Sequence, residues 1–446
     1  MRKLLKKLTY TQIIVLSFLL VILVGTLLLC LPVSSANGTF TPPLNAMFTA
    51  TSATCVTGLV VYDTFTHWSL FGQIVIISLI QIGGLGFLVF ISMFSVFLKK
   101  KIGVYERRLL MQAEGNIRLS GAVVLLKRIV RGTFTFEAVG AVILAFRFCP
   151  KMGLAEGIFN AIFHAVSAFC NAGFDLMGKY KQFSSLSTFA EDPVVMITII
   201  SLVVIGGIGF LVWSDIVTLK TKVKKYSLHT KITLSTTAIL LIGSTLLFLL
   251  LEYNGVLKDF SFFDKIINAT FLAVSPRTAG FNTVDLSALS SGSEVITDLL
   301  MLIGGSPGST AGGLKTTTFA VLILSTIAAA RHDTHPQIFK RRLPDDALSQ
   351  ATAIFTIYVV VSLVAVVMVS TLEKCDVTTA AFEVISAIGT VGATKGLTPT
   401  LCGASKLIIM GLMFGGRVGG LSLMLSLAEK RENIPLDRPS EKILIG

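Results

Sequence analysis

The sequence FTATSATCVTGL at residues 48–59 decides the fold, because three further stretches of the chain resemble it. Each stretch begins with Phe, has Ser four residues later and reaches a Gly five or six residues after that Ser. The other three are FHAVSAFCNAGF at residues 163–174, FLAVSPRTAGF at residues 271–281 and FEVISAIGTVGA at residues 382–393. One match arises easily by chance, whereas four at near-equal intervals predict a repeated structural unit.

The flanks of the four stretches are also alike. A long apolar run precedes each one, and a second apolar run with adjacent glycines follows it; the pairs are Gly83-Gly84, Gly206-Gly207, Gly304-Gly305 and Gly415-Gly416. The chain is 53% hydrophobic and only 14% charged, which is too little charge for a soluble surface. About 20 apolar residues cross a bilayer core as a helix. We therefore expect an all-α polytopic membrane protein with about eight spans.

This pattern predicts four tandem repeats of helix, pore loop and helix around one central pore. The repeats are expected at residues 1–103, 104–225, 226–342 and 343–428, with a cytoplasmic tail at residues 429–446. Within each repeat, the element before the glycine is too short to span: residues 45–54, 159–169, 263–274 and 378–388 would make helices of roughly 15–18 Å. A re-entrant helix followed by a loop fits this length, since irregular backbone at that depth must be buried in protein or line a cavity.

Basic residues are clustered between the apolar runs. The net charge of +13 would suit nucleic acid, but most of the 38 Lys and Arg residues lie in five segments that alternate with weakly charged ones. The segments are residues 1–10, 99–131, 220–231, 331–342 and the tail from residue 430. This alternation is typical of cytoplasmic loops. It argues against nucleic-acid binding and predicts a multi-pass protein of the cell membrane with both termini in the cytoplasm.

The four glycines predict a binding site for a bare monovalent cation. Rings of backbone carbonyls can replace the hydration shell of such an ion without adding fixed charge. Aiming successive carbonyls at one axis requires dihedral angles that glycine permits, and each short helix would point its negative C-terminal end at the ion. The candidate cation-binding residues are Val56, Thr57 and Gly58; Asn171, Ala172 and Gly173; Thr278, Ala279 and Gly280; and Thr390, Val391 and Gly392.

A second candidate site interrupts the apolar run at residues 295–330. The sequence GGSPGSTAGGLK at residues 304–315 breaks any helix there, because it clusters glycine with proline. The expected result is a polar loop at mid-membrane, beneath the glycines, in the third repeat. Lys315 follows this loop, and Arg417 lies inside another apolar run, where cations are costly and usually functional. Glu137 and Glu252 are expected near the ends of their spans, paired or interfacial, without a role in the pore.

With these motifs the chain resembles the Ktr/Trk/HKT superfamily of potassium transporters, and most closely the bacterial Ktr membrane subunit. The resemblance covers almost the whole chain and implies one potassium pore per chain. Glycine in all four filters implies potassium over sodium, since plant sodium-selective relatives carry serine where this chain has Gly58. Trk-type relatives usually begin with two extra spans, whereas this chain starts with the first repeat, which favours Ktr. A Trk-type transporter remains an alternative.

The resemblance also implies a gate and partners. The gate would consist of Gly304, Gly305, Ser306, Pro307, Gly308, Ser309, Thr310, Ala311, Gly312 and Gly313 with Lys315 and Arg417, the arginine touching the loop. Such subunits pair as homodimers on a cytosolic ring of nucleotide-binding regulatory subunits, for which residues 220–231, 331–342 and 429–446 are candidate contacts. This chain has no nucleotide-binding motif of its own, so no cofactor is expected in it. Activation by sodium and the identity of the nucleotide stay open.

Other function classes fit the sequence less well. An enzyme is not expected, because the five His residues show no metal-binding spacing and no nucleophile motif is present. A voltage-gated channel would need a helix with regularly spaced arginines before the pore. The stronger rival is an ion-coupled secondary carrier, which also uses broken helices at mid-membrane. Such carriers show twofold repeats, whereas this chain shows four.

Overall fold

The computed structural model describes residues 10–86, 122–333 and 335–419 of the chain. The basic segment at residues 1–9, most of the one at 99–131 and the tail from residue 420 lie outside the described residues. Helices dominate the described part, with one short antiparallel hairpin in which Gln337 pairs with Arg342. This confirms the expected all-helical class.

The elements follow one another in a repeating order of long and short helices. They are α2 (Tyr10–Cys30), α3 (Pro43–Thr54), α4 (Thr64–His67), α5 (Leu70–Leu85), α8 (Ala122–Met152), α9 (Leu154–Phe169), α10 (Pro193–Gly207), α11 (Phe210–Leu219), α12 (Leu228–Leu251), α13 (Phe262–Val274), α14 (Ser291–Leu302), α15 (Thr316–Ala330), β1 (Gln337–Ile338), β2 (Arg341–Arg342), α16 (Ala347–Glu373), α17 (Val377–Gly389) and α18 (Gly403–Val418). Single 3-10 turns lie at Pro32–Ser34, Met177–Lys179, Ser187–Phe189, Val223–Lys225, Leu286–Ala288 and Thr398–Thr400.

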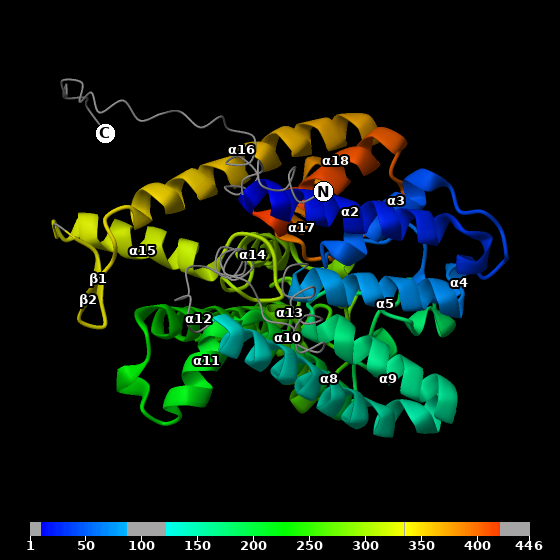
Figure 1. Ribbon diagram of the computed structural model, residues 1–446, viewed down its shortest axis with the longest axis horizontal. Helices are drawn as coiled ribbons and strands as arrows, with labels where there is room; N and C mark the ends of the chain where they lie inside the picture. The colour runs from blue at the N-terminus through cyan, green and yellow to red at the C-terminus, as the bar shows by residue number, and fades with distance from the viewer. Residues whose placement is uncertain (1–9, 87–121, 334, 420–446) are drawn as a thin grey trace.

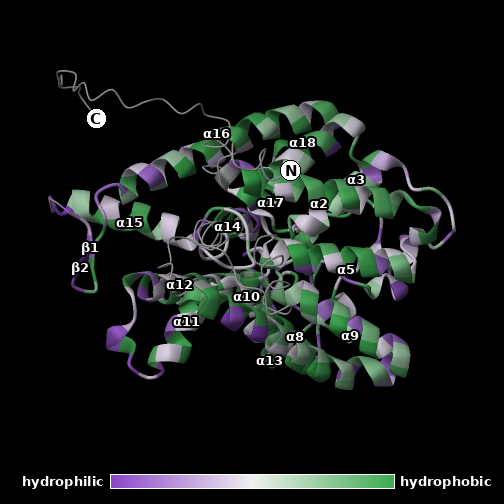
Figure 2. Cartoon of the chain, in the orientation of Figure 1, coloured by the Kyte–Doolittle hydropathy of each residue, from purple (hydrophilic) through white to green (hydrophobic). Residues whose placement is uncertain are grey.

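Four of the described helices are long and apolar enough to cross a membrane. They are α2, α8, α12 and α16, and the bent pair α10 and α11 adds a fifth if it is counted as one span. The expected number of about eight is therefore met only in part. Helices α14 and α15 are separated by the loop, while α5 and α18 are 16 residues long where the described segments end. Figure 2 shows apolar residues over most helices and hydrophilic residues at the β1–β2 hairpin.

The helices close into a cycle. Each long helix packs on the short helix that follows it: α2 on α3, α8 on α9, α12 on α13 and α16 on α17. We call a long helix, the short helix after it and the helices that follow, up to the next long helix, a set. The helix after each short helix, or after α4 in the first set, contacts the short helix of the following set: α5 contacts α9, α10 contacts α13, α14 contacts α17, and α18 returns to α3. The C-terminal helices α17 and α18 accordingly lie beside the N-terminal α2 and α3 (Figure 1).

The four short helices end where the sequence predicts. Their last residues are Thr54, Phe169, Val274 and Gly389, against predicted ends at residues 54, 169, 274 and 388. Helix α9 starts five residues before its predicted start at residue 159, because only Gly153, with φ of 89°, separates it from α8. Helix α13 begins at Phe262, one residue before its predicted start, because Ser261 caps it: the Ser261 side chain accepts a hydrogen bond from the Asp264 N–H.

A second break in the helices was not predicted from the sequence. Helices α10 and α11 meet at an angle of 95°, and Gly209 between them has φ of 97°. Equivalent glycines end α5 and α18, where Gly86 has φ of 82° and Gly419 has φ of 92°. Since each lies three residues beyond Gly83, Gly206 or Gly416, three sets share one stop signal. The structural counterpart of Gly83 is thus Gly416, and Arg417 occupies the place of Gly84.

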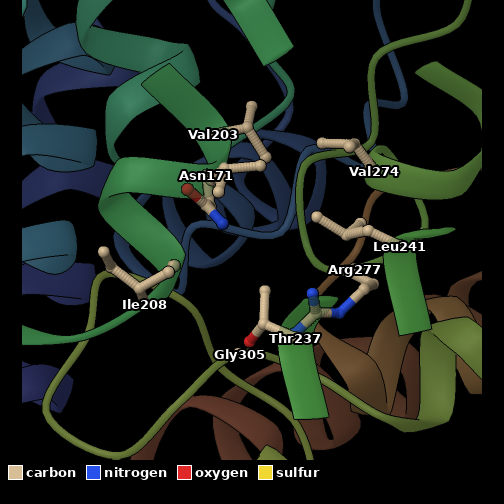
Figure 3. Close-up of a pocket in the computed structure, with 10 residues that line it drawn as sticks. Asn171, Val203, Ile208, Thr237, Leu241, Val274, Arg277 and Gly305 are labelled. Atoms are coloured by element: carbon tan, nitrogen blue, oxygen red, sulfur yellow. The ribbon is translucent and has the colours of Figure 1, made fainter. Parts of the chain in front are cut away.

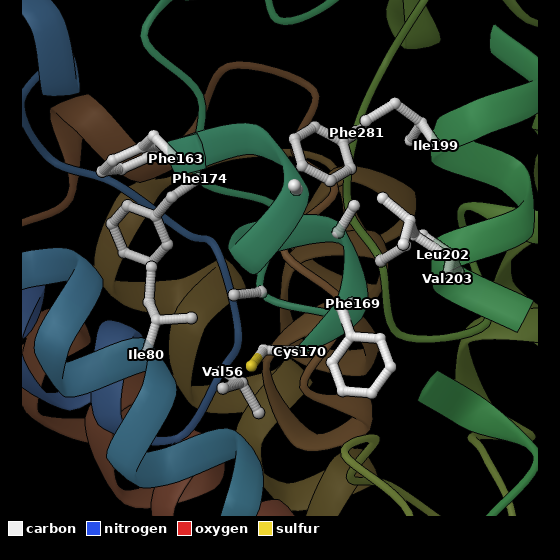
Figure 4. Close-up of a cluster of buried hydrophobic side chains, with 14 of the residues drawn as sticks. Val56, Ile80, Phe163, Phe169, Cys170, Phe174, Ile199, Leu202, Val203 and Phe281 are labelled. Carbon is white, nitrogen blue, oxygen red and sulfur yellow. The ribbon is translucent and has the colours of Figure 1, made fainter. Parts of the chain in front are cut away.

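Large apolar side chains surround the short helices. Phe163 and Phe169 of α9 are fully buried, together with Phe174 and Phe281 in the segments that follow α9 and α13. Figure 4 shows the Cys170 side chain next to Val56, which joins the segments after α9 and α3. Cys55 and Cys170 are buried free thiols, and such thiols pack as small apolar side chains. This packing holds the four segments against one another.

Glu252 caps the C-terminal end of α12 and ties it to the start of α14. Its carboxylate accepts hydrogen bonds from the Ser290 N–H at 3.0 Å, the Ser290 hydroxyl at 2.6 Å and the Val256 N–H at 3.3 Å. Burial raises the pKa of this carboxyl, but the hydrogen bonds from Ser290, Ser293 and Val256 together outweigh burial, so the pKa lies below its usual value of 4.5. The expected paired position at a helix end is therefore observed.

We expect acid to weaken this cap. Because the folded pKa lies below the unfolded one, the carboxylate stabilises the fold above pH 4.5, and its contribution is lost as the pH falls through the folded pKa. At neutral pH, Glu252→Gln should cost about 2 kcal/mol of stability, and its melting temperature in detergent should fall less steeply with acid than that of the wild type. The exposed Asp259→Asn is the control. Identical acid profiles for Glu252→Gln and wild type would contradict this role.

Candidate functional site

The segment after each short helix turns back on the helix in the same way. In every set, the residue before the predicted filter glycine donates its N–H to the backbone carbonyl of the repeated serine. The four hydrogen bonds run from Thr57 to Ser52, from Ala172 to Ser167, from Ala279 to Ser275 and from Val391 to Ser386, each at 2.8 Å. The one-residue deletion in the third stretch leaves this bond intact.

The backbone of the four segments follows one rule. The filter glycines have positive φ, at 95° for Gly58, 69° for Gly173, 72° for Gly280 and 91° for Gly392. The residues two positions earlier also have positive φ, at 50° for Val56, 57° for Asn171, 74° for Thr278 and 51° for Thr390, whereas the residues between them do not. In an ordinary strand successive residues face opposite sides. Left-handed dihedrals at every second residue instead turn successive carbonyls to the same side.

The four glycines form a closed ring, which we call the glycine ring. A Cβ atom on Gly58 would lie 2.5 Å from the Ala172 carbonyl oxygen, and one on Gly173 would lie 2.5 Å from that of Ala279. The same relation joins Gly280 to the Val391 oxygen at 2.2 Å and Gly392 to the Thr57 oxygen at 2.1 Å. Every step therefore places a glycine against a carbonyl of the next segment, and the last step returns to the first.

The ring residues are buried, and their polar groups are unevenly paired. All twelve predicted filter residues are buried. In two neighbouring segments, the Asn171 amide lies 3.0 Å from the Thr278 hydroxyl. In the other two, the hydroxyls of Thr57 and Thr390 have no hydrogen-bond partner among the described residues. Orphaned buried hydroxyls are costly, so these oxygens are available to a polar ligand at the ring.

The loop between α14 and α15 docks directly beneath the ring. It closes at its neck through a hydrogen bond of 2.8 Å from the Gly304 N–H to the Leu314 carbonyl. Its Thr310 hydroxyl donates to the Phe169 carbonyl at 3.0 Å, at the end of α9. Its Gly312 lies so close to Thr390 that an added Cβ would come within 2.1 Å of the threonine hydroxyl. The predicted gate residues are therefore placed against two segments of the predicted filter.

The paired glycines supply the carbonyls that hold this loop. The Ser306 N–H donates to the Gly207 carbonyl at 3.0 Å, and the Thr310 N–H donates to the Gly206 carbonyl at 3.3 Å. On the opposite side, the Gly313 N–H donates to the Gly416 carbonyl at 3.2 Å. Sequence reasoning noticed these pairs but gave them no role. Their small size also lets the helices approach, since a Cβ on Gly206 would lie 2.0 Å from the Phe169 oxygen.

Two cationic side chains, Arg417 and Lys315, form hydrogen bonds with carbonyls of the loop. Arg417, on α18, donates to the Thr310 carbonyl in the loop and to the Gly83 carbonyl of α5, and it donates to the Gly84 carbonyl at 2.9 Å. Lys315 donates to the Ala311 carbonyl at 2.8 Å, within the loop itself. The arginine thus contacts the loop, as the resemblance implied, and also links it to the first set of helices.

A small cavity beside the third segment contains a buried arginine that sequence reasoning passed over. The cavity has a volume of about 20 Å³, enough for one water molecule. Figure 3 shows the Arg277 guanidinium extending toward Gly305 of the loop. Its Nε has no partner among the described residues. Helices α10 and α13 end at this cavity, and their negative C-terminal ends suit a cation there. The signal available in the sequence was that Arg277 is the one charged residue of the stretch at residues 271–281.

Glu137 is the one acidic side chain that the sequence placed wrongly. It lies in the middle of α8 rather than near a helix end, and only 5% of it is exposed. The Cys170 thiol lies 3.9 Å from its carboxylate. The apolar residues on both sides of Glu137 fit a span as well as a span end, so hydropathy alone did not fix its depth.

Known proteins resemble this chain over nearly its whole length. The family model described as TrkH, a cation transport protein, matches residues 5–434. The potassium/sodium uptake protein NtpJ of Enterococcus hirae is 41% identical over 99% of this chain and 98% of its own length. The Ktr system potassium uptake protein B of Bacillus subtilis is 39% identical over 98% of this chain and 97% of its own length.

A solved structure shares the fold. The potassium transporter TrkH from Vibrio parahaemolyticus superimposes with a TM-score of 0.71, covering 92% of this chain and 84% of its own, at 18% identity. At that identity the likeness concerns the fold alone. The family itself is shown by the match over nearly the whole sequence and by the two relatives near 40% identity. They establish that the chain belongs to the TrkH family of cation transport proteins.

Proposed function

We propose that this protein takes up potassium across the cell membrane by channel-like conduction through the glycine ring. The observation that carries the proposal is the ring itself, four segments whose left-handed residues alternate in register and whose glycines each abut a neighbour's carbonyl. Such an arrangement offers an ion several layers of carbonyl oxygens. The names of the two relatives, a potassium/sodium uptake protein and a potassium uptake protein, point to the same cargo.

The proposed potassium ligands are the twelve predicted filter residues. Their carbonyls would form stacked layers, from Val56, Asn171, Thr278 and Thr390 through Thr57, Ala172, Ala279 and Val391 to the four glycines. The unpaired hydroxyls of Thr57 and Thr390 add oxygens on one side of the pore. The short helices α3, α9, α13 and α17 end at these segments, so their negative ends favour a cation there.

The loop at residues 304–313 is the proposed gate. It is hydrogen-bonded beneath the ring to three sets of helices, through Gly206 and Gly207, Gly416 and, by way of Arg417, Gly83 and Gly84. An ion leaving the ring toward the loop would meet Thr310, Gly312 and the positive charges of Arg417 and Lys315. Conduction then requires the loop to leave these glycine carbonyls. The hydrogen bonds to these carbonyls and to Arg417 would then set the barrier to its release.

The cyclic packing of the helices supports four repeats with both termini in the cytoplasm. We place the repeats at residues 1–103, 104–225, 226–342 and 343–428, each with two spans and one re-entrant helix. The third repeat would span the membrane as α14 and α15 together, and the second as α10 and α11. The basic turn before α12 and the β1–β2 hairpin would then share the cytoplasmic side.

The partners proposed are a second copy of this chain and a cytosolic ring of nucleotide-binding subunits. The basic regions at residues 220–231 and 331–342 meet on one surface, which suits contact with such subunits. Lys231 at the start of α12 lies 5.9 Å from the ring of Phe339 in the hairpin, and Ile232 packs with Leu343. The nucleotide would be bound by the partner. Sodium is proposed as an activating ion because one relative is named for both potassium and sodium.

Potassium uptake by transport-deficient cells tests the proposal. Cells that express this chain with a cytosolic Ktr partner should accumulate potassium from low external concentration, and excess sodium should compete poorly. Dissipating the proton gradient while holding the membrane potential should leave uptake unchanged, since conduction through a pore needs no coupled ion. Uptake that stops with the proton gradient would instead indicate an ion-coupled carrier. Equal transport of sodium and potassium would contradict a selective ring.

A further inference from the structure

A buried serine recurs in the sequence motif, between the Phe and the Gly of each stretch. Ser52, Ser167, Ser275 and Ser386 stand at the same position in the four stretches, and none is more than 6% exposed. Their backbone carbonyls accept the common hydrogen bond described above. Their hydroxyls make a further hydrogen bond to the same segment, and this second bond divides the four sets into two pairs.

In the first and fourth sets, the hydroxyl accepts a hydrogen bond from the filter glycine. The Gly58 N–H donates to Ser52 Oγ at 3.1 Å, and the Gly392 N–H donates to Ser386 Oγ at 3.1 Å. In a trans peptide the N–H and the preceding carbonyl point in opposite directions. Holding the Gly58 N–H toward the serine therefore turns the Thr57 carbonyl away from it. That oxygen is the one that abuts Gly392 in the ring.

In the second and third sets, the hydroxyl donates to the residue after the glycine. Ser167 Oγ donates to the Phe174 carbonyl at 2.7 Å, and Ser275 Oγ donates to the Phe281 carbonyl. Both of these sets have Phe after the glycine, whereas the other two have Leu59 and Ala393. Here the hydroxyl holds the chain beyond the ring. The Gly280 N–H is held by the Ser275 backbone carbonyl at 3.2 Å, without help from the hydroxyl.

We propose that the four serines are positioning residues for ion selectivity and that they act unequally. Ser52 and Ser386 orient the Thr57 and Val391 carbonyls that line the ring, whereas Ser167 and Ser275 anchor the segment outside it. The proposal rests on the proposed function, because it assumes that the ring binds the transported ion. The first and fourth sets adjoin through the contact of Gly392 with Thr57. The carbonyls that depend on a hydroxyl thus lie next to each other.

Removing the hydroxyl has different consequences in the two pairs. In Ser52→Ala, a buried N–H loses its acceptor, and a buried N–H without a partner is strongly disfavoured. Rotation of the peptide between Thr57 and Gly58 relieves the N–H but takes the Thr57 oxygen out of the ring. In Ser167→Ala, a carbonyl loses one donor, which proteins tolerate more often. The ring carbonyls of the second set keep their orientation.

The test measures potassium uptake with sodium in competition for single serine-to-alanine variants of the whole chain, assembled with its partner in cells. Ser52→Ala and Ser386→Ala should lower the potassium-to-sodium preference on the order of tenfold, equivalent to about 1.4 kcal/mol. Ser167→Ala and Ser275→Ala should change it far less. Ser52→Thr, which keeps a hydroxyl, should retain the preference. Ser244→Ala, whose hydroxyl bonds the Leu240 carbonyl within α12, is the control for a buried serine remote from the ring.

A purely structural role makes a different prediction. If the serines only support folding, all four alanine variants should lower the amount of protein and the maximal rate while leaving the preference unchanged, and that result would overturn the proposal. A preference that falls equally in all four would overturn the division into pairs. Gly58→Ser in the same assay separates this proposal from the proposed function. If Gly58→Ser alters the preference and Ser52→Ala does not, the serine proposal alone fails.

Discussion

Gly58→Ser is expected to lower the preference of this protein for potassium over sodium by roughly tenfold or more. Gly58 has φ of 95°, and a residue with a side chain in a left-handed conformation costs about 1–2 kcal/mol. The added Cβ would also lie 2.5 Å from the Ala172 carbonyl oxygen and 3.2 Å from the Gly173 Cα. Because tenfold corresponds to about 1.4 kcal/mol, strain of this size, relieved by moving a ring carbonyl, is enough to change the ion that fits.

Uptake of potassium in competition with sodium measures this change, beside the amount of protein in the membrane. Gly243→Ser is the matched control, because Gly243 lies in α12 with no atom within 4 Å of its added Cβ. The same substitution at Gly173, Gly280 or Gly392 should act in the same direction, since each glycine meets a neighbouring carbonyl. An unchanged preference in Gly58→Ser, with normal amounts of protein, would rule out the glycine ring as the selective element.

The sequence was sufficient for the parts of this fold that depend on repetition. The short helices end within a residue of prediction because the same Phe, Ser and Gly recur at fixed spacing. The filter glycines were recognisable because the backbone conformation they adopt is one that side chains resist. The broken third inner helix was recognisable from its glycines and Pro307. These features depend on local residue types, which can be identified from a single sequence.

Other parts of the candidate site depend on contacts that no local pattern records. Val56, Asn171, Thr278 and Thr390 adopt left-handed dihedrals although three of the four are β-branched, a residue type for which this conformation is a genuine outlier. In each case the next residue donates its N–H to the backbone carbonyl of the repeated serine, so this conformation belongs to the turn and not to the propensity of the residue. The 95° break at Gly209 was missed because the apolar residues on both sides of Gly209 predict one continuous span.

The glycine pairs have a role that their residue type alone did not predict. From the sequence they were a marker of the repeat. In the structure one glycine of the pair in three sets, namely Gly83, Gly206 and Gly416, lets a helix approach the end of a short helix. A Cβ on Gly83 would lie 1.9 Å from the Thr54 oxygen, and one on Gly416 would lie 2.1 Å from the Ile388 oxygen. Their carbonyls then bind the loop or Arg417. One small residue therefore serves both the packing of a helix and the attachment of the loop.

Arg417→Ala is expected to raise the rate of potassium uptake. The arginine joins the loop at Thr310 to the end of α5 at Gly83 and Gly84, so its removal frees the loop from the first set of helices. It also removes a positive charge that a potassium ion would approach after leaving the ring. Hydrogen bonds that involve a charged group contribute about 1.5–3 kcal/mol each. Losing even one of them would shift the loop toward its released position by roughly tenfold.

The maximal uptake rate per molecule of membrane protein measures this gain. A second variant, Arg417→Lys, separates the effect of the charge from the effect of the hydrogen bonds. Arg417→Lys keeps the charge but cannot make the forked contacts of a guanidinium, so a rate near that of Arg417→Ala would assign the barrier to the contacts. A rate near that of the wild type would assign it to the charge. Lys406→Ala removes a cation from the same helix α18, where it bonds Asn45 away from the loop, and should not raise the rate. Uptake by Arg417→Ala at or below the wild-type rate would contradict the loop as a gate, because a barrier that loses one of its two positive charges and its attachment to α5 must conduct more.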